Sequence, residues 1–130
     1  PIGHTEGNNL EEKKVINKIK PVLEDKSIKK IGQNIKFDYI IFFHRGIKMN
    51  SMEDTMLMSY VLDAGKNRHN MDLLSEIHLD HKTISFKDVV GTGKKQINFS
   101  EVDIDKAKDY AAEDADITFR LYKKFIKNLY

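Results

Sequence analysis

The chain has 130 residues, of which 40% are hydrophobic and 32% charged, and its formal net charge at pH 7 is +2. This length and composition are typical of one soluble globular domain and argue against disorder. The longest apolar run, residues 39–43, is far shorter than the roughly 20 residues that cross a bilayer, and the small net charge does not by itself indicate nucleic-acid binding. The absence of cysteine excludes disulfides and thiolate metal sites and is compatible with a reducing cytoplasm.

The spacing of apolar residues predicts mostly helices with little strand. In chain order we expect a helix from near Asn9 to about residue 25, a short strand in 29–34 that ends at Gly32, helices over 34–46, 52–65 and 71–81, an irregular segment over 82–99, and a helix from about Asp103 to the end. Pro21 is a possible kink in the first helix. Asn34 is the expected N-cap of the second helix and Gly46 its end.

Acidic residues crowd the start of the last predicted helix, in the stretch "KDYAAEDAD" (108–116). At 100° per residue, Asp109 and Asp116 fall on the polar side and Glu113 on the flank. Asp114 instead lies in the apolar stripe, one turn after Tyr110. That stripe contains Ala107, Tyr110, Ala111, Ile117, Thr118, Leu121 and Phe125.

A second acid lies among apolar residues in the helix predicted over 34–46. Asp38 is the only acid in "NIKFDYIIFFHRG", and apolar side chains surround it on nearly every side, so we expect this helix to be buried. An isolated buried carboxylate costs several kcal/mol or takes up a proton. Asp38 and Asp114 therefore each need a cation, and periodicity leaves open whether it is an Arg or Lys side chain or a metal ion; helix capping is a further alternative.

Four segments of the sequence occur in the same order as in a known protein family. They are "KKIGQNIKFD" (29–38), "EDTMLMSYVLDAGKNRHNMDLLSE" (53–76), "HKTISFKDVVGTGKKQINF" (81–99) and "YAAEDAD" (110–116). Together they resemble the 3′–5′ exonuclease (proofreading) domain of bacterial DNA polymerase I, over nearly the whole chain. Asn-x-x-x-Asp at 34–38 is similar to the second exonuclease motif of that family, and Tyr-x-x-x-Asp at 110–114 to the third.

The resemblance implies an α/β, ribonuclease-H-like fold and a role in DNA replication and repair in a bacterial, nucleoid-associated setting. The implied activity is hydrolysis of the 3′-terminal phosphodiester of single-stranded or frayed DNA, which releases nucleoside 5′-monophosphates. Two Mg²⁺ or Mn²⁺ ions are the implied cofactors, with Asp114 a direct ligand of the tighter metal and Asp38 serving the second through water. Tyr110 is implied to orient the attacking water. Carboxylates suit such ions because hard Mg²⁺ takes oxygen ligands.

Further positions are implied to contact DNA, and each has a structural alternative. Gln33, Asn34 and Phe37 match residues that line the terminal nucleotides, although Asn34 also suits an N-cap and Phe37 a core position. Arg68 matches a phosphate contact or is a solvated loop residue. Phe86 matches an aromatic that stacks on a base or is a loop anchor.

The first exonuclease motif of the family, Asp-x-Glu on the opening strand, has no match in these residues. We therefore expect residues 1–130 to be a single exonuclease domain that is truncated at its N-terminus, that lacks the first strands of its sheet and that is inactive alone. A covalently attached polymerase domain is the expected partner in the parent protein. The alternative function is a non-catalytic domain that holds DNA or braces a polymerase.

Three other patterns are interpreted as structural. "GTGKK" (91–95) lacks the spacing of a phosphate-binding loop, and His78 with His81 has no third zinc ligand nearby. The aromatic and basic residues over 122–127 would lie partly in the core and partly in solvent on a helix, so they do not form one nucleic-acid-binding face.

Overall fold

A computed structural model describes residues 1–129, and one long C-terminal helix forms its axis. The elements are α1 (Glu12–Glu24), β1 (Lys30–Gly32), α2 (Lys36–Phe43), β2 (Met52–Asp54), α3 (Thr55–Asp63), α4 (Met71–Leu79), α5 (Phe86–Val90), the 3₁₀ turns η1 (Gly93–Lys95) and η2 (Phe99–Glu101), and α6 (Ile104–Leu129). Within the described residues no helix has the combination of length and apolar character that crossing a membrane requires.

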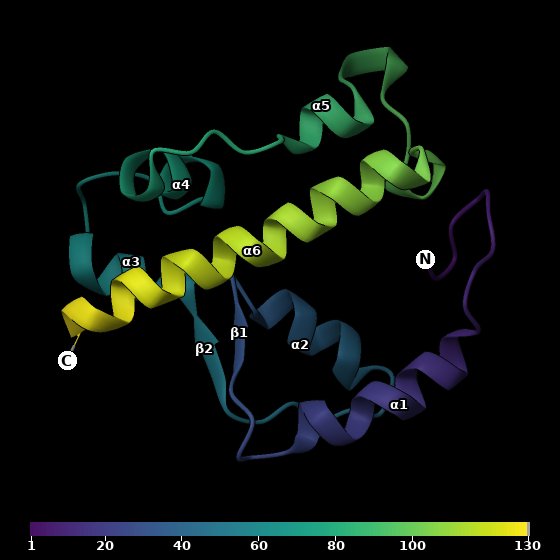
Figure 1. The fold of residues 1–130 in the computed structure, drawn as a ribbon, viewed down its shortest axis with the longest axis horizontal. Helices are drawn as coiled ribbons and strands as arrows, with labels where there is room; N and C mark the ends of the chain where they lie inside the picture. The colour runs from purple at the N-terminus through teal and green to yellow at the C-terminus, as the bar shows by residue number, and fades with distance from the viewer. Residues whose placement is uncertain (130) are drawn as a thin grey trace.

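Helix α6 divides the molecule into two sides. Figure 1 shows α4 and α5 along one side of α6, and β1, β2, α2 and α1 on the other. The N-terminal segment returns to the beginning of α6, where the Thr5 N–H donates a hydrogen bond to the Ser100 carbonyl at 2.8 Å. Helix α6 therefore contacts both sides, and successive turns of this one helix serve the candidate site and the core.

The sheet consists of two short parallel strands. Lys30 in β1 pairs with Met52 in β2, and Gly32 pairs with Asp54. The strand predicted to end at Gly32 is confirmed. The helix predicted over 52–65 is wrong at its start, because residues 52–54 form β2 and helix α3 begins only at Thr55. Strand β2 continues into α3 without an intervening residue, so no turn signal separates the two in the sequence.

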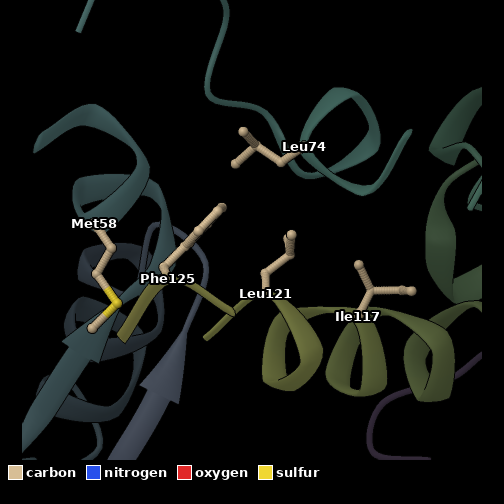
Figure 2. Packing of buried hydrophobic residues seen from close by; sticks show 5 residues of the cluster. All are labelled: Met58, Leu74, Ile117, Leu121 and Phe125. Carbon is tan, nitrogen blue, oxygen red and sulfur yellow. The ribbon is translucent and has the colours of Figure 1, made fainter. Parts of the chain in front are cut away.

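The main hydrophobic core lies where α3, α4 and α6 meet. Its buried members are Met58, Leu74, Ile117, Leu121 and Phe125, which point toward one another in Figure 2. Phe125 and Leu121 are one turn apart on α6, as the apolar stripe of the sequence predicted. A smaller cluster of Val90, Val102 and Ala107 holds α5 and the beginning of α6 together.

Helix α2 is not buried, contrary to the sequence prediction. It has no buried residue, and three of its large apolar side chains, Phe37, Ile41 and Phe43, are 60%, 52% and 57% exposed. The sequence pattern was apolar on nearly all sides, which is typical of a buried helix. The described residues, however, cover only parts of its surface, so packing contributes little to holding α2 in place.

A carboxylate from β2 anchors the beginning of α2 instead. Asp54 accepts hydrogen bonds from the backbone N–H groups of Asn34 (2.9 Å) and Ile35 (3.1 Å), and it also caps α3 through the N–H of Met56 (2.9 Å). The expected N-cap role of Asn34 is therefore wrong. Asn34 adopts a left-handed backbone conformation (φ 58°), which Asn tolerates better than most residues.

The remaining helix boundaries differ from the predictions by a few residues or by one added element. Helix α1 begins at Glu12 rather than near Asn9, and α2 ends at Phe43, before the predicted stop at Gly46. The segment expected to be irregular contains α5, which Ser85 and Asp88 close with a capping box. The long last helix is confirmed to Leu129; its predicted final residue lies outside the described range.

Replacing Asp54 with Ala should destabilise the fold by about 2–3 kcal/mol, because three N–H groups at two helix beginnings lose a charged acceptor. Asp54→Asn should lose about half as much, since its amide oxygen still accepts a hydrogen bond. Urea unfolding measures both values. Asp109→Ala is the matched control: its carboxylate is 67% exposed and caps nothing, so a change below about 0.5 kcal/mol is expected. Equal effects of Asp54→Ala and Asp109→Ala would contradict the anchoring role.

Candidate active site

A cavity of about 860 Å³ opens between α6, α2, β1 and the beginning of α4. Asp38 from α2, and Tyr110 and Asp114 from α6, all line it. These are the three residues that the motifs singled out as candidates for catalysis, and they come from segments more than 70 positions apart. The fold thus brings the two short motifs to one place.

Tyr110 and Asp114 lie one turn apart on the cavity face of α6, and both are half-buried. Burial raises the pKa of the Asp114 carboxyl above its ordinary value, and the nearby carboxylates of Asp72 and Glu113 raise it further. Burial also raises the pKa of the Tyr110 phenol, with added contributions from Asp114 and Asp72. Tyr110 therefore stays protonated at neutral pH and keeps its hydroxyl as a hydrogen-bond donor.

Asp38 faces the same cavity from the opposite wall, one turn before Phe42. Its residue is largely exposed, yet partial burial of the carboxyl raises its pKa, and the charge of Asp54 raises it further. Its own backbone N–H partly offsets these effects. Both catalytic candidates are thus carboxylates whose charge the metal-free protein disfavours.

Neither carboxylate has a basic partner among residues 1–129, where the ion pairs involve other acids. Two lysines line the cavity, but other groups engage them. Lys30 donates to the backbone carbonyls of Val22, Asp25 and Ile28. Lys29 pairs with Glu53 at 3.1 Å and donates to the Tyr122 hydroxyl at 2.9 Å. Of the explanations that the sequence left open, pairing with Arg or Lys and helix capping find no support within the described residues.

Asp72 is a third carboxylate of the cavity, and sequence analysis missed it. It lies in the first turn of α4, where an acid is ordinarily explained by the helix dipole. The Thr83 hydroxyl donates a hydrogen bond to its Oδ1 at 2.7 Å, and its charge raises the pKa values of Asp114 and Tyr110. No periodicity signal marks it, because its proximity to α6 arises from tertiary packing.

The donor set suits a hard divalent cation but is incomplete for one. The acidic side chains that line the cavity would supply carboxylate oxygens as ligands, which Mg²⁺ and Mn²⁺ prefer. Within the part of the chain that the structure describes, however, no three His, Cys, Asp or Glu side chains come close enough to hold a metal ion. Asp38 and Asp114 line one cavity from two walls without forming a closed ligand cluster.

Gln33 also lines the cavity, but its amide is already bonded within the protein. Its Oε1 accepts a hydrogen bond from the Thr55 hydroxyl at 2.5 Å, and its Nε2 donates to the His69 carbonyl at 2.8 Å. The His69 ring in turn contacts the Ser59 hydroxyl at 2.9 Å. Thr55 and Ser59 are fully buried. Gln33 thus ties the end of β1 to the segment between α3 and α4.

The other four proposed DNA contacts, Asn34, Phe37, Arg68 and Phe86, do not line the cavity. Phe37 is exposed on α2, and Arg68 is exposed in the loop before α4. Asn34 lies beside a separate hollow, and its side-chain Oδ1 is buried without a hydrogen-bond partner among residues 1–129. Phe86 is 46% exposed, and its ring centroid lies 6.0 Å from that of Tyr110.

The two histidines at 78 and 81, which we did not interpret as a zinc site, both have partners within the protein. The His81 ring bonds Glu113 at 2.8 Å, and the backbone N–H of Ile84 donates to the same carboxylate at 2.6 Å. Glu113 therefore attaches the segment after α4 to α6 rather than facing only solvent. His78 packs edge-on against Phe125 in the core, at 4.9 Å between centroids.

Comparison with known proteins agrees with the order of the motifs. Residues 4–130 match the 3′–5′ exonuclease family. The chain belongs to this family. The resemblance drawn from the four sequence blocks is thereby confirmed, and the cavity that contains Asp38, Tyr110 and Asp114 is the candidate active site of this exonuclease chain.

Similar proteins include three bacterial DNA polymerases I. The chain is 50% identical to that of Rhizobium leguminosarum over 115 residues, which are 88% of the chain and 11% of that protein. It is 41% identical to that of Pseudomonas aeruginosa, over 92% of the chain and 14% of that protein. For Borreliella burgdorferi the identity is 38%, over 92% of the chain and 13% of that protein. The chain thus spans only about a seventh or less of these relatives.

Neutralising Asp114 should stabilise the metal-free exonuclease chain at pH 7. A carboxyl whose pKa is raised on folding contributes stability that is present below its ordinary value of 3.8 and is lost as pH rises through the raised pKa. Asp114→Asn should therefore raise the Tm in EDTA at pH 7, and the difference from wild type should vanish below pH 3.8. Thermal melts from pH 3 to 8 measure this.

Asp116→Asn is the matched control for that experiment. It lies two residues further along α6 and pairs at the surface with Arg120 at 2.8 Å. Its replacement should leave the Tm at pH 7 unchanged or slightly lower. A Tm of Asp114→Asn at or below wild type at pH 7 would show that the Asp114 charge is well solvated.

Gln33→Leu should destabilise the chain by about 1–2 kcal/mol, because the His69 carbonyl loses its donor and the Thr55 hydroxyl loses an acceptor. Gln96→Leu, at an exposed position, is the control and should change the unfolding free energy by less than about 0.5 kcal/mol. Urea unfolding compares the two. If Gln33→Leu matches the control, the amide of Gln33 is free to contact a ligand.

Proposed function

We propose that this chain is the proofreading 3′–5′ exonuclease domain of a DNA polymerase I, and that it removes nucleotides from single-stranded or frayed 3′ ends of DNA. The family membership and the names of the relatives support this proposal. The observation that carries it is the convergence of Asp38, Tyr110 and Asp114 on one cavity, with no basic partner for either acid among residues 1–129.

Asp114 and Asp38 are the chain's own residues that would hold two divalent metal ions. Such ions, when bound, would neutralise phosphate charge, lower the pKa of a water and stabilise the leaving 3′ oxygen. Binding a cation would also offset the burial of the Asp114 charge and its repulsion by Asp72, the two largest causes of the raised pKa of Asp114. The remaining carboxylates of the site would come from an Asp-x-Glu on a strand outside these 130 residues, within a ribonuclease-H-like α/β fold.

Tyr110 would orient the nucleophile. Its phenol is protonated at neutral pH, because burial and two neighbouring carboxylates raise its pKa. It can therefore donate a hydrogen bond to the attacking water or to a phosphate oxygen. The water oxygen attacks phosphorus, the P–O3′ bond breaks, and the shortened strand leaves with a 3′ hydroxyl while the terminal nucleotide leaves as a 5′-monophosphate.

A second candidate function is a non-catalytic domain that holds DNA or supports a polymerase. One observation favours it: within the described part of the chain no three ligand side chains gather for a metal. The two candidates differ in what a completed site does. If the upstream Asp-x-Glu supplies the remaining ligands, the first candidate predicts cleavage and the second predicts only DNA binding.

An extended protein that includes the residues encoded upstream of Pro1 tests the proposal. With Mg²⁺ it should release mononucleotides from single-stranded DNA labelled at its 3′ end, and Asp114→Ala should lower the rate by orders of magnitude while DNA binding stays measurable. Tyr110→Phe should slow cleavage by about 100-fold with little change in metal affinity, because only one positioned hydroxyl is lost.

Asp116→Ala is the control on the same helix and should retain full activity, since Asp116 faces solvent away from the cavity. Chromatography of the released products separates mononucleotides from longer fragments. If the extended wild-type protein binds DNA but releases no mononucleotide, the non-catalytic candidate is correct.

A further inference from the structure

Three aromatic rings form one contiguous cluster at the edge of the cavity. The centroids of Phe86 and Phe99 lie 6.1 Å apart with nearly parallel planes (22°). Tyr110 closes the triangle, with its centroid 6.0 Å from Phe86 and 5.9 Å from Phe99 at tilts of 57° and 59°. Tyr110 lines the cavity, Phe86 is 46% exposed, and Phe99 is half-buried. Phe99 therefore touches both an exposed ring and the ring that carries the candidate catalytic hydroxyl.

The backbone around the first two rings is held by polar contacts. Phe86 is the first residue of α5, which the Ser85–Asp88 capping box closes. Phe99 is the first residue of η2, where the Asn98 N–H donates to the Glu101 carboxylate at 2.8 Å. Both rings thus project from fixed short turns rather than from free loops.

Phe99 also has a contact besides those with Tyr110 and Phe86. The His4 ring meets it edge-on, with 6.5 Å between centroids, and His4 Nε2 contacts the Val102 carbonyl. Val102 itself is buried. Phe99 therefore contacts the cluster of Val90, Val102 and Ala107 as well as the two rings, and its removal would free both rings to tilt.

We propose that Phe99 is a positioning residue of the exonuclease reaction: it holds the exposed Phe86 ring, on which a nucleobase of single-stranded DNA stacks, in register with the Tyr110 hydroxyl. This inference rests on the function proposed above. Stacking of a base on Phe86 is sequence-tolerant because every base has a π face. Without Phe99 the base platform and the hydroxyl lose their common support, so the scissile phosphate and the attacking water become misaligned.

The kinetic test uses the extended protein with Mg²⁺ and compares Phe99→Ala, Phe99→Leu and Phe99→Tyr. Loss of alignment should lower kcat by about 10- to 100-fold in the Ala and Leu variants and should change KM less than kcat. Phe99→Tyr keeps the flat ring and should return kcat to within about threefold of wild type. Phe43→Ala is the matched control, because Phe43 belongs to an exposed stacked pair with Tyr39 (5.9 Å, 21°) on α2 and does not line the cavity.

A second measurement is independent of catalysis. Single-stranded DNA that ends in 2-aminopurine, bound in EDTA, reports base stacking through its fluorescence. Phe99→Ala should reduce the stacking signal toward that of Phe86→Ala, whereas Phe43→Ala should leave it unchanged. Failure of the extended wild type to cleave DNA would overturn the proposed function, and this stacking signal would still test whether Phe99 supports Phe86.

Two results would overturn the inference while the exonuclease function stands. One is kcat and stacking in Phe99→Ala equal to those of wild type. The other is a kcat that falls equally in Phe99→Leu and Phe99→Tyr, with a fall in Tm to match in each variant. The ring of Phe99 would then matter only for packing.

Discussion

The carboxylate of Asp54 joins the beginnings of two helices, α2 and α3, at one end of the small sheet. It lies at the end of β2, and because β1 and β2 are parallel, it lies beside the end of β1 as well. There it accepts hydrogen bonds from backbone N–H groups in the turn into α2 and in the first turn of α3. One carboxylate at the adjacent ends of two strands thus supplies an acceptor to the beginnings of two helices. Each helix would otherwise leave its first N–H groups without partners. The direction of α2, and with it the location of Asp38, follows from this contact.

Helix α6 performs two tasks with successive turns of one stripe of its surface. Ile117, Leu121 and Phe125 pack in the core, whereas Tyr110 and Asp114, one to two turns earlier, line the cavity. Since the core face is fully buried, the rotation of α6 about its axis is fixed, and the orientation of the two polar residues is fixed with it. Glu113, which bonds His81 and the Ile84 N–H, adds a polar attachment near the same point. The candidate catalytic residues on α6 therefore stand on a rigid element.

The sequence was sufficient for the features that depend on local periodicity and on motif order. It predicted the long last helix, the separation of Asp114 from the solvated Asp116, the short strand at Gly32 and the family. It did not predict β2, which runs directly into α3 with no turn residue between them, nor the role of Asp54, since a cap supplied from another strand leaves no local pattern. Asp72 was missed for a similar reason: its helix position suggested a dipole effect, and only packing against α6 brings it to the cavity. The prediction that α2 is buried was wrong because an all-round apolar helix shows that a helix suits burial, not which residues cover it.

The two walls of the cavity are thus held by different kinds of force, and this difference bears on how the site works. Asp114 stands on a helix that is packed in the core through the following turns of the same stripe, whereas Asp38 stands on a helix that is tethered at its first turn and mostly exposed beyond it. Burial disfavours the charge of both carboxylates, and neither has a basic partner among residues 1–129. A bound cation would offset this unfavourable charge and would stabilise the arrangement in which it binds. Because α2 has the weaker packing, any rearrangement of the cavity would move α2, and Asp38 with it, more readily than α6 and Asp114.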